Sequence, residues 1–380
     1  MELISFNIPY YSEKCIDNIK ETCLKGKISG DGYFSKKCTD LLKNKYNFDE
    51  CHLVTSCTHA LEMMAMLIEI KEGDEVIIPS YTFVSTANAF VKFGAKIICV
   101  DSKKDNPNID PIDIEKNITS KTKAICIVHY AGWGCDMEKI VELCKKHNII
   151  LLEDAAQAIH SFYKEKLLGT FGDMSAFSFH ETKNINCGEG GLLVINNKKY
   201  SERAYIIREK GTNRTQFFEK KVDKYEWIDK GSSYLLSDIN AAYLYPQIEN
   251  IENIIKKRET IWNTYYENLK PYEKYNVFIT CEKVSNCTGN YHIFYLLFNN
   301  NEKLREIKNL LECNAIMSTT HYVPLHKSHY YIKNFGNKTL PNSEKFGDCI
   351  LRLPIHNHID INDITSVCNI IQNYLTSLKK

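Results

Sequence analysis

The chain has 380 residues, of which 44% are apolar and 25% are charged, and its formal net charge is +1. This balance predicts a globular protein with a large core and more than one domain, and it argues against nucleic acid or a membrane as the main partner. We expect a cytoplasmic protein without a leader peptide, whose 15 cysteines are reduced and, lacking any CxxC pair, bind no metal.

Strands and helices alternate in the first half of the chain. Seven short β-branched runs are predicted strands, at residues 52–55, 75–79, 95–101, 123–130, 148–154, 174–179 and 191–196. Segments with helical spacing of apolar residues lie between them, at 58–70, 82–94 and 136–148. The alternation predicts an α/β fold with a mainly parallel seven-stranded sheet, whose ligands bind at the carboxyl ends of the strands.

The pattern changes after about residue 240. One long helix is predicted over 237–269, and mixed α/β sequence follows it. We therefore predict a large ligand-binding domain over residues 1–245 and a smaller C-terminal α/β domain over residues 246–380.

A strand, a short polar turn and a helix follow one another in "VTSCTHALEMM", residues 54–64. The free N–H groups and the dipole at the start of this helix favour an anion, and the hydroxyls of Ser56 and Thr58 lie in the same turn. Ordinary capping of the helix explains the same residues.

An acidic pair, Glu153 and Asp154, ends the apolar run "NIILLED", and Gln157 follows three residues after Asp154. A carboxylate at the carboxyl end of a buried parallel strand can reach a ligand above the sheet. Periodicity alone slightly favours another interpretation, in which Asp154 is the N-cap of a following helix.

A lone lysine, Lys183, stands in "SFHETKNINCGEGG" after another strand that ends at the same edge. The glycines after it allow a tight turn rather than forming a dinucleotide fingerprint. An amine for a Schiff base, an acid and an anion cradle at one edge together fit pyridoxal phosphate.

Long ordered motifs support this interpretation: "ISGDGYFSKKC", "EDAAQA", "SFHETKN", "GEGG", "REKGTNR", "GSSYLLSDINAAYL" and "HYVPLH". In these motifs the chain resembles the DegT/StrS family of sugar-nucleotide aminotransferases over nearly its whole length. The resemblance implies a fold-type I, aspartate aminotransferase-like fold and a homodimer with shared active sites.

The resemblance also implies roles for residues at the cofactor ring. Lys183 matches the lysine that forms the Schiff base and moves protons, and Asp154 matches the carboxylate that keeps the pyridine nitrogen protonated. Gln157 matches the residue that hydrogen-bonds the ring oxygen, and Phe83 matches the aromatic side chain that stacks on the ring. Phe83 can equally be a plain core residue.

The phosphate-binding residues implied by the resemblance are Cys57, Thr58 and Ser178. Cys57 replaces the glycine of many relatives, which matters little if its backbone N–H is the donor. Relatives also carry an asparagine that reaches the partner's phosphate, where this chain has Ser233. A serine reaches less far than an asparagine, but it can still donate one hydrogen bond to that phosphate.

Substrate contacts are assigned less specifically. The "HYVPLH" loop, which the family places over the active site, offers His321, Tyr322 and His326. Arg208 and Arg214 either meet the diphosphate of a sugar nucleotide or are solvated surface charges.

The implied reaction moves an amino group from L-glutamate, through pyridoxamine 5'-phosphate, to carbon 4 of a dTDP- or UDP-linked 4-keto-6-deoxyhexose. The product is a 4-amino-4,6-dideoxy sugar of gluco or galacto configuration for glycans. The alternatives are a 3-aminotransferase or 3-dehydratase of the same family, and a non-catalytic sugar-nucleotide-binding protein. The family's dehydratases carry histidine in place of the Schiff-base lysine, so Lys183 argues against that branch.

Overall fold

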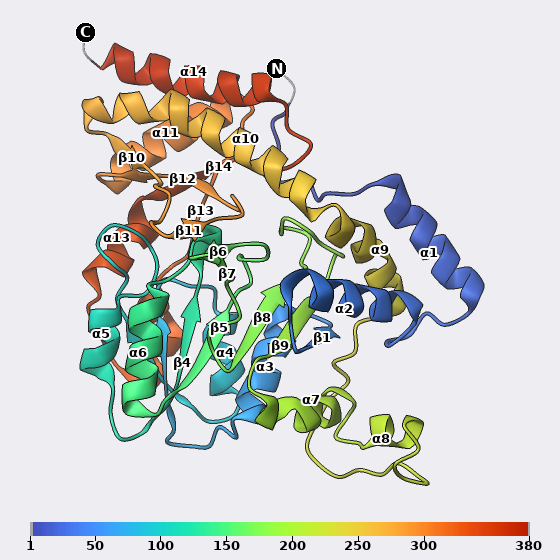
Figure 1. Ribbon diagram of the computed structural model, residues 1–380. Helices are drawn as coiled ribbons and strands as arrows, with labels where there is room; N and C mark the ends of the chain where they lie inside the picture. The colour runs from blue at the N-terminus through green and yellow to red at the C-terminus, as the bar shows by residue number, and fades with distance from the viewer. Residues whose placement is uncertain (1–2, 379–380) are drawn as a thin grey trace.

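The computed structural model describes residues 3–378 and contains a central sheet in the strand order β1-β9-β8-β5-β4-β2-β3 (Figure 1). The strands are β1 (Glu50–Val54), β2 (Glu75–Pro79), β3 (Lys96–Val100), β4 (Thr122–Val128), β5 (Ile150–Asp154), β8 (Met174–Ser178) and β9 (Gly191–Ile195). Parallel pairing joins β3, β2, β4, β5 and β8, whereas β9 is antiparallel to both β8 and β1. The predicted mainly parallel sheet of seven strands is confirmed.

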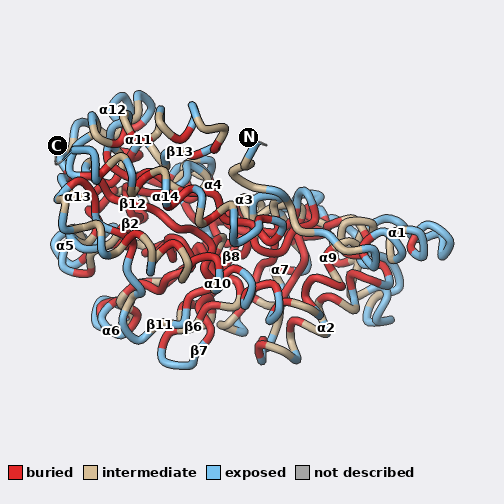
Figure 2. The backbone as a smooth tube through the Cα atoms, turned by 90° about the horizontal axis from the view of Figure 1, so that it is seen from above, coloured by how far each residue is buried: buried red, intermediate tan, exposed pale blue. Residues whose placement is uncertain are grey.

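Helices cover both faces of this sheet because successive strand residues point to opposite sides. Leu151 packs into one core cluster and Leu152 into the other. The first face is covered by α2 (Tyr33–Tyr46), α5 (Pro111–Asn117), α6 (Met137–His147) and α9 (Asp238–Glu249). The second is covered by α3 (Cys57–Leu67), α4 (Ser85–Val91) and α7 (Ser201–Arg208). Figure 2 shows the buried strands enclosed by helices with exposed outer surfaces.

The prediction of one continuous helix over 237–269 is wrong. The segment forms two helices, α9 and α10 (Ile251–Leu269), because the backbone leaves the helical region at Asn250, with φ −103° and ψ 16°. Pro246 lies inside α9 and has no N–H to donate to the preceding turn, which weakens the helix just before the break.

A second sheet has the strand order β10-β12-β14-β13. Its strands are β10 (Phe278–Thr280), β12 (Phe294–Phe298), β13 (Thr319–Thr320) and β14 (Ile350–Leu353). The helices of this region are α10, α11 (Asn301–Cys313), α13 (Pro341–Cys349) and α14 (Ile361–Ser377), and α10 lies along α14 at the top of Figure 1. The residue at which the domains divide stays a prediction, and position 245 falls within α9.

The remaining elements lie outside these two sheets. A three-stranded sheet joins β11 (Cys287–Thr288) to β6 (Phe162–Tyr163) and β7 (Lys166–Leu167). The other helices are α1 (Glu13–Lys25), α8 (Arg214–Phe218) and α12 (His329–Phe335), with short 3-10 turns at 130–132, 198–200, 270–275 and 325–327. None of the helices within residues 3–378 is both long and apolar enough to cross a membrane.

Candidate active site

Three strand ends meet at one edge of the central sheet. Asp154 at the end of β5 pairs with Ala176, and Ser178 at the end of β8 pairs with Gly191. Gly191 also pairs with Val54, so β1 ends at the same edge as β8. A cavity of about 450 Å³ opens there, between this edge and the second sheet.

Most of the residues predicted for the site line this cavity. They are Cys57, Thr58, Phe83, Asp154, Gln157, Ser178, Lys183, His321 and Tyr322. Among the predicted residues, Arg208, Arg214, Ser233 and His326 do not line the cavity in this chain.

Asp154 does not cap a helix, because the chain after β5 forms turns. Its Oδ2 accepts a hydrogen bond from Thr86 Oγ1 at 2.7 Å, and its Oδ1 accepts one from the backbone N–H of Ala156 at 3.1 Å. Burial raises the pKa of the Asp154 carboxyl, whereas these two hydrogen bonds and the charge of Lys183 oppose the rise. The carboxylate is therefore held in a fixed orientation at the cavity wall.

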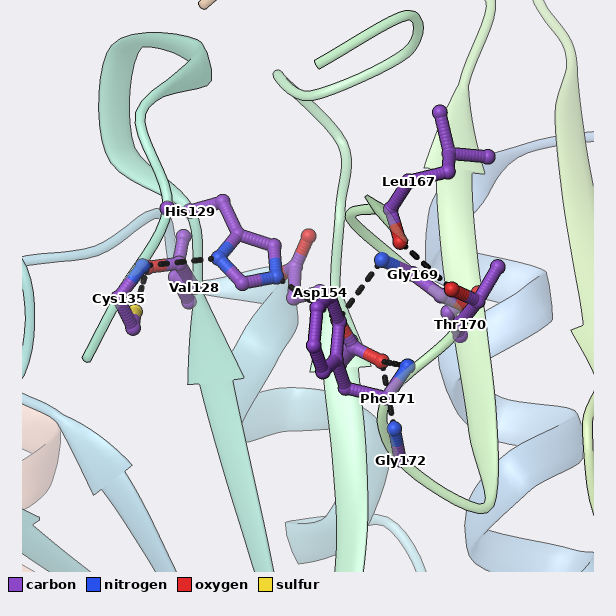
Figure 3. Close-up of polar contacts among 12 residues, drawn as sticks. Val128, His129, Cys135, Asp154, Leu167, Gly169, Thr170, Phe171 and Gly172 are labelled. Carbon is purple, nitrogen blue, oxygen red and sulfur yellow. Dashed lines mark hydrogen bonds and ion pairs between the residues drawn. The ribbon is translucent and has the colours of Figure 1, made fainter. Parts of the chain in front are cut away.

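The neighbouring acid, Glu153, is a fully buried structural group, which the alternation of side chains along β5 places on the opposite face from Asp154. Figure 3 shows the 169–172 turn and the ring of His129 beside the end of this strand. Three backbone N–H groups of the 169–172 turn donate to its carboxylate, each at 2.7 Å. His129 Nδ1 accepts from the N–H of Cys135, so its Nε2 carries the proton and donates to Glu153 at 3.0 Å. These bonds fix the end of β5 and hence the position of Asp154.

Lys183 lies in a loop that is closed by backbone hydrogen bonds. The N–H of Phe179 donates to Gly190 at 2.8 Å, and the N–H of Lys183 donates to His180 at 2.9 Å. Gly188 has φ +78°, which allows the tight turn predicted for this stretch. Burial lowers the pKa of the Lys183 ammonium, and the charge of Arg352 adds to that effect, which favours the nucleophilic neutral amine.

The first turn of α3 lies against the start of β9. Ser56 is an N-cap whose Oγ accepts from the N–H of His59 at 3.1 Å, so the capping interpretation of this residue is correct. Thr58 Oγ1 donates to Ser85 Oγ at 2.8 Å, and both side chains line the cavity. A Cβ on Gly191 would lie 2.4 Å from the Ser56 carbonyl carbon, so only glycine lets the turn approach this closely.

Phe83 is not a core residue, because 57% of its surface is exposed at the cavity. Its ring centroid lies 6.1 Å from that of Tyr322. Gln157 Oε1 accepts from the N–H of Ala131 at 2.6 Å, and its Nε2 donates to Tyr322 Oη at 3.1 Å. Gln157 thus joins the central sheet to the loop that follows β13.

His326 lies outside the cavity and has a structural role. The residue is buried, its Nδ1 lies 2.6 Å from Ser80 Oγ, and its Nε2 lies 3.0 Å from Glu344 Oε1. These contacts attach the 321–326 loop to the end of β2, which positions His321 at the cavity.

The two arginines predicted to meet a diphosphate lie elsewhere. Arg208 is buried and forms an ion pair with Asp31, so it is not a solvated charge. Arg214 forms an ion pair with Glu209 at 2.7 Å. Ser233 is exposed and lies outside the cavity of its own chain, so its contact with a partner's phosphate stays a prediction.

His292 is a cavity residue that the sequence analysis missed. Asn184 Nδ2 donates to the carbonyl of Asn290 at 2.8 Å, so Asn184 Oδ1 faces His292 Nδ1, also at 2.8 Å. His292 Nδ1 must therefore carry the proton, and its Nε2 is an acceptor. Burial, together with the charge of Lys183, lowers the pKa of His292 well below its usual value, so the ring is neutral.

Two arginines on the side of the second sheet, Arg258 and Arg352, also line the cavity. Arg258 donates to the carbonyls of Tyr291 and His292 at 3.2 and 2.7 Å, and burial lowers the pKa of Arg258 to about 9. The sequence does contain a feature that could have indicated Arg352 as a site residue, because this single cation interrupts the apolar run "ILRLP". No comparable signal marks His292 or Arg258.

The polar groups of the cavity fit pyridoxal phosphate. Within residues 3–378, no cluster of His, Cys, Asp or Glu is suited to a metal ion. Lys183 supplies an amine of lowered pKa, Asp154 supplies a carboxylate for a ring nitrogen, and the first turn of α3 supplies N–H groups for a phosphate. This site on a mainly parallel seven-stranded sheet defines a fold-type I pyridoxal-phosphate enzyme.

The chain belongs to the DegT/DnrJ/EryC1/StrS aminotransferase family, whose model matches residues 9–372. It is 31% identical to GDP-perosamine synthase of Escherichia coli O157:H7 over 97% of this chain and 98% of that protein. Helicobacter pylori PseC, an aminotransferase involved in the biosynthesis of pseudoaminic acid, has the same fold, with a TM-score of 0.91, 26% identity and coverage of 99% and 100% of the two chains.

The structure of Spr1654 from Streptococcus pneumoniae in its PLP form also shares the fold, with a TM-score of 0.90, 23% identity and coverage of 99% of each chain. The protein is therefore a sugar aminotransferase that depends on pyridoxal phosphate.

Proposed function

We propose that the protein transfers the amino group of L-glutamate to carbon 4 of a nucleotide-linked 4-keto-6-deoxyhexose, which gives a 4-amino-4,6-dideoxy sugar for glycan biosynthesis. The observation that carries the proposal is the meeting of Lys183, Asp154 and the first turn of α3 in one cavity. The choice of carbon 4, and of dTDP or UDP as the nucleotide, rests on the resemblance of the motifs.

The cofactor and two side chains of the site, Lys183 and Asp154, have separate chemical roles in this reaction. When bound, pyridoxal phosphate supplies an aldehyde that takes up the amino group and a ring that accepts electrons from the carbon being deprotonated. Lys183, whose ammonium pKa is lowered by burial, would remove a proton from the reacting carbon as a neutral amine and return it as the ammonium. Asp154, whose carboxylate is oriented by Thr86 and Ala156, would hold the proton on the ring nitrogen of the bound cofactor.

The opposite wall of the cavity suits a sugar. His292 Nε2 can accept a hydrogen bond from a hydroxyl group, because Asn184 fixes its tautomer. Burial lowers the pKa of His321 to about 2, so this ring is also neutral. It stacks on Tyr322 with ring centroids 3.9 Å apart. Neutral hydrogen-bonding groups beside an aromatic face are a common way to bind a sugar ring.

Two chains are proposed to build each site. The segment that contains Ser233 lies outside its own cavity, and it carries exposed aromatic side chains such as Trp227, at 81% exposure. In a twofold dimer each chain gives and receives the same segment. Ser233 would then contact the phosphate held by the partner.

The related 3-aminotransferases and 3-dehydratases are the alternatives, and the product distinguishes them. The protein is incubated with L-glutamate and, separately, with dTDP-, UDP- and GDP-linked 4-keto-6-deoxyhexoses, and the products are identified by NMR. The GDP-linked arm is included because one relative is named for GDP-perosamine. We expect an amine at carbon 4 and one 2-oxoglutarate per amine, with no product from Lys183→Ala. An amine at carbon 3, or loss of the 3-hydroxyl, would reject the proposal.

A further inference from the structure

The N-terminal segment, residues 4–10, runs along the wall of the cavity. One end lies beside β13, where Ile4 pairs in parallel with Ile316. The other end is attached to the loop between β8 and β9, because Asn186 Nδ2 donates to the carbonyl of Tyr10 at 3.1 Å. We call this segment the strap, since it extends from the second sheet to the loop that carries the Schiff-base lysine.

Two residues of the strap, Phe6 and Asn7, line the cavity. The ring of Phe6 is held by the guanidinium of Arg352, whose Cζ lies 4.8 Å from the ring centroid. The carbonyl of the preceding residue, Ser5, accepts a hydrogen bond from His356 Nε2 at 3.2 Å. These contacts fix the backbone just before Asn7, so its side chain is held at the cavity wall.

The amide of Asn7 has unused capacity for hydrogen bonds. Its Nδ2 donates to the carbonyl of Glu181 at 3.5 Å, which is longer than the usual range for such a bond. Its Oδ1 makes no hydrogen bond with any group in residues 3–378. A side-chain amide has two donor hydrogens and an oxygen with two lone pairs, so Asn7 can both donate to a ligand and accept from it. Because Glu181 stands two positions before Lys183, that ligand group is expected near the reacting carbon.

A second donor and acceptor line the cavity on the loop that Asn7 contacts. The N–H of Thr182 donates to His180 Nδ1 at 3.3 Å, so His180 Nε2 carries the proton. This Nε2 lies 3.7 Å from Glu189 Oε1, which is too far for a direct hydrogen bond. A hydroxyl group can accept from the first and donate to the second. A ligand carboxylate would instead be repelled by Glu189.

We propose that Asn7 and Glu189 bind hydroxyl groups of the keto sugar, so that the N-terminal strap helps to select the acceptor of the amino group. The proposal rests on the proposed sugar-nucleotide acceptor, but not on which ring carbon receives the amine. A site built to bind hydroxyl groups discriminates strongly against a sugar that lacks them, because its own polar groups lose their partners. Because Glu189 repels a carboxylate, this pair does not bind the amino donor.

The test compares Asn7→Ala and Glu189→Gln with wild type and with Ser5→Ala, a matched change on the strap at a residue that does not line the cavity. The pyridoxamine phosphate form of each protein is mixed with dTDP-, UDP- and GDP-linked 4-keto-6-deoxyhexoses, and the return of the aldehyde absorbance gives a second-order rate constant. We expect this constant to fall about 3- to 10-fold in Asn7→Ala and about 10- to 100-fold in Glu189→Gln, because one neutral and one charged hydrogen bond are lost. The reaction with L-glutamate alone should stay within about twofold of wild type in all three variants, and Ser5→Ala should match wild type with the sugars as well.

Sugars that lack one hydroxyl group identify the contact. The accepted sugar nucleotide is compared with its 2-deoxy and 3-deoxy analogues, and Asn7→Ala should cause no further loss with the analogue that lacks the contacted hydroxyl. The proposal is wrong if either cavity variant stays within twofold of wild type with the parent sugar, if the loss in Asn7→Ala persists with both analogues, or if the reaction with L-glutamate falls in parallel. A wild-type protein that reacts with none of the sugar nucleotides would reject the proposed function and this proposal with it, whereas a reactive wild type with unaffected variants rejects this proposal alone.

Discussion

Replacing Asp154 by asparagine would remove the charge of this carboxylate and keep its shape. In the wild type, Oδ1 accepts from the N–H of Ala156 at 3.1 Å and Oδ2 accepts from Thr86 Oγ1 at 2.7 Å. An asparagine can keep the first bond and donate to Thr86 Oγ1, whose own proton can then turn to Thr82 Oγ1 at 2.9 Å. Burial raises the pKa of Asp154, so its charge does not stabilise the unliganded fold. We expect the unfolding free energy to change by less than about 1 kcal/mol.

The effect on catalysis should be far larger. Two unit charges about 4 Å apart interact by about 4 kcal/mol at an effective dielectric constant of about 20. Without the carboxylate, the ring nitrogen loses that stabilisation of its proton when the ring must accept electrons. Each 1.4 kcal/mol of barrier is about a factor of ten in rate, so Asp154→Asn should slow the reaction with L-glutamate about a thousandfold.

Stopped-flow absorbance with saturating L-glutamate measures this rate, and urea unfolding of the same preparation measures the stability. Cofactor affinity, measured by equilibrium dialysis, should fall much less than the rate. A rate within tenfold of wild type would refute the role of the carboxylate at the ring. A large loss of stability would show that the exchange of hydrogen bonds through Thr86 does not take place.

Three other predictions follow from the site. Lys183→Ala should fold normally but lose the cofactor's absorbance band and all transamination, and any remaining turnover would reject the assignment of this lysine. Gly191→Ala should weaken cofactor binding at least tenfold and cost about 1–3 kcal/mol of stability, because its Cβ would lie 2.4 Å from a backbone carbon of Ser56. Gly188→Ala, with no atom within 4 Å of its Cβ but φ +78°, is the control that loses stability without losing cofactor affinity. Ser233→Ala should weaken cofactor retention by the roughly 0.5–1.5 kcal/mol of one hydrogen bond. Mixing it with Lys183→Ala should restore one intact site per mixed dimer, and no recovery would rule out shared sites.

The central sheet could be predicted because its strands are short, β-branched and separated by amphipathic helices. The break in the helix at Asn250 was missed because the helical spacing of apolar residues continues from α9 into α10. A periodic pattern of this kind does not reveal a single residue with a non-helical backbone. The helix-cap interpretation of Asp154 failed because it considered only residues near in sequence. The carboxylate is oriented by Thr86, which belongs to α4, 68 positions earlier in the chain.

Substrate residues were harder to predict than cofactor residues. Cofactor residues stand at strand ends, where the pattern of the sheet brings them together, as Asp154 and Ser178 show. The second sheet contributes His292 and Arg352, whose approach to Lys183 depends on how its strands pack against the central sheet. Arg208 was interpreted from its charge alone, as a diphosphate contact or a solvated surface charge, but its guanidinium forms an ion pair with Asp31.

Reduction of the holoenzyme with borohydride, followed by proteolysis and mass spectrometry, tests most directly whether Lys183 holds the cofactor. We predict that the yellow colour bleaches and that the cofactor is found on a single peptide, attached to Lys183. The Lys183→Ala protein, treated in the same way, should carry no cofactor on any peptide. Attachment to another lysine, or a wild-type protein that binds the cofactor without any covalent product, would contradict the site described above.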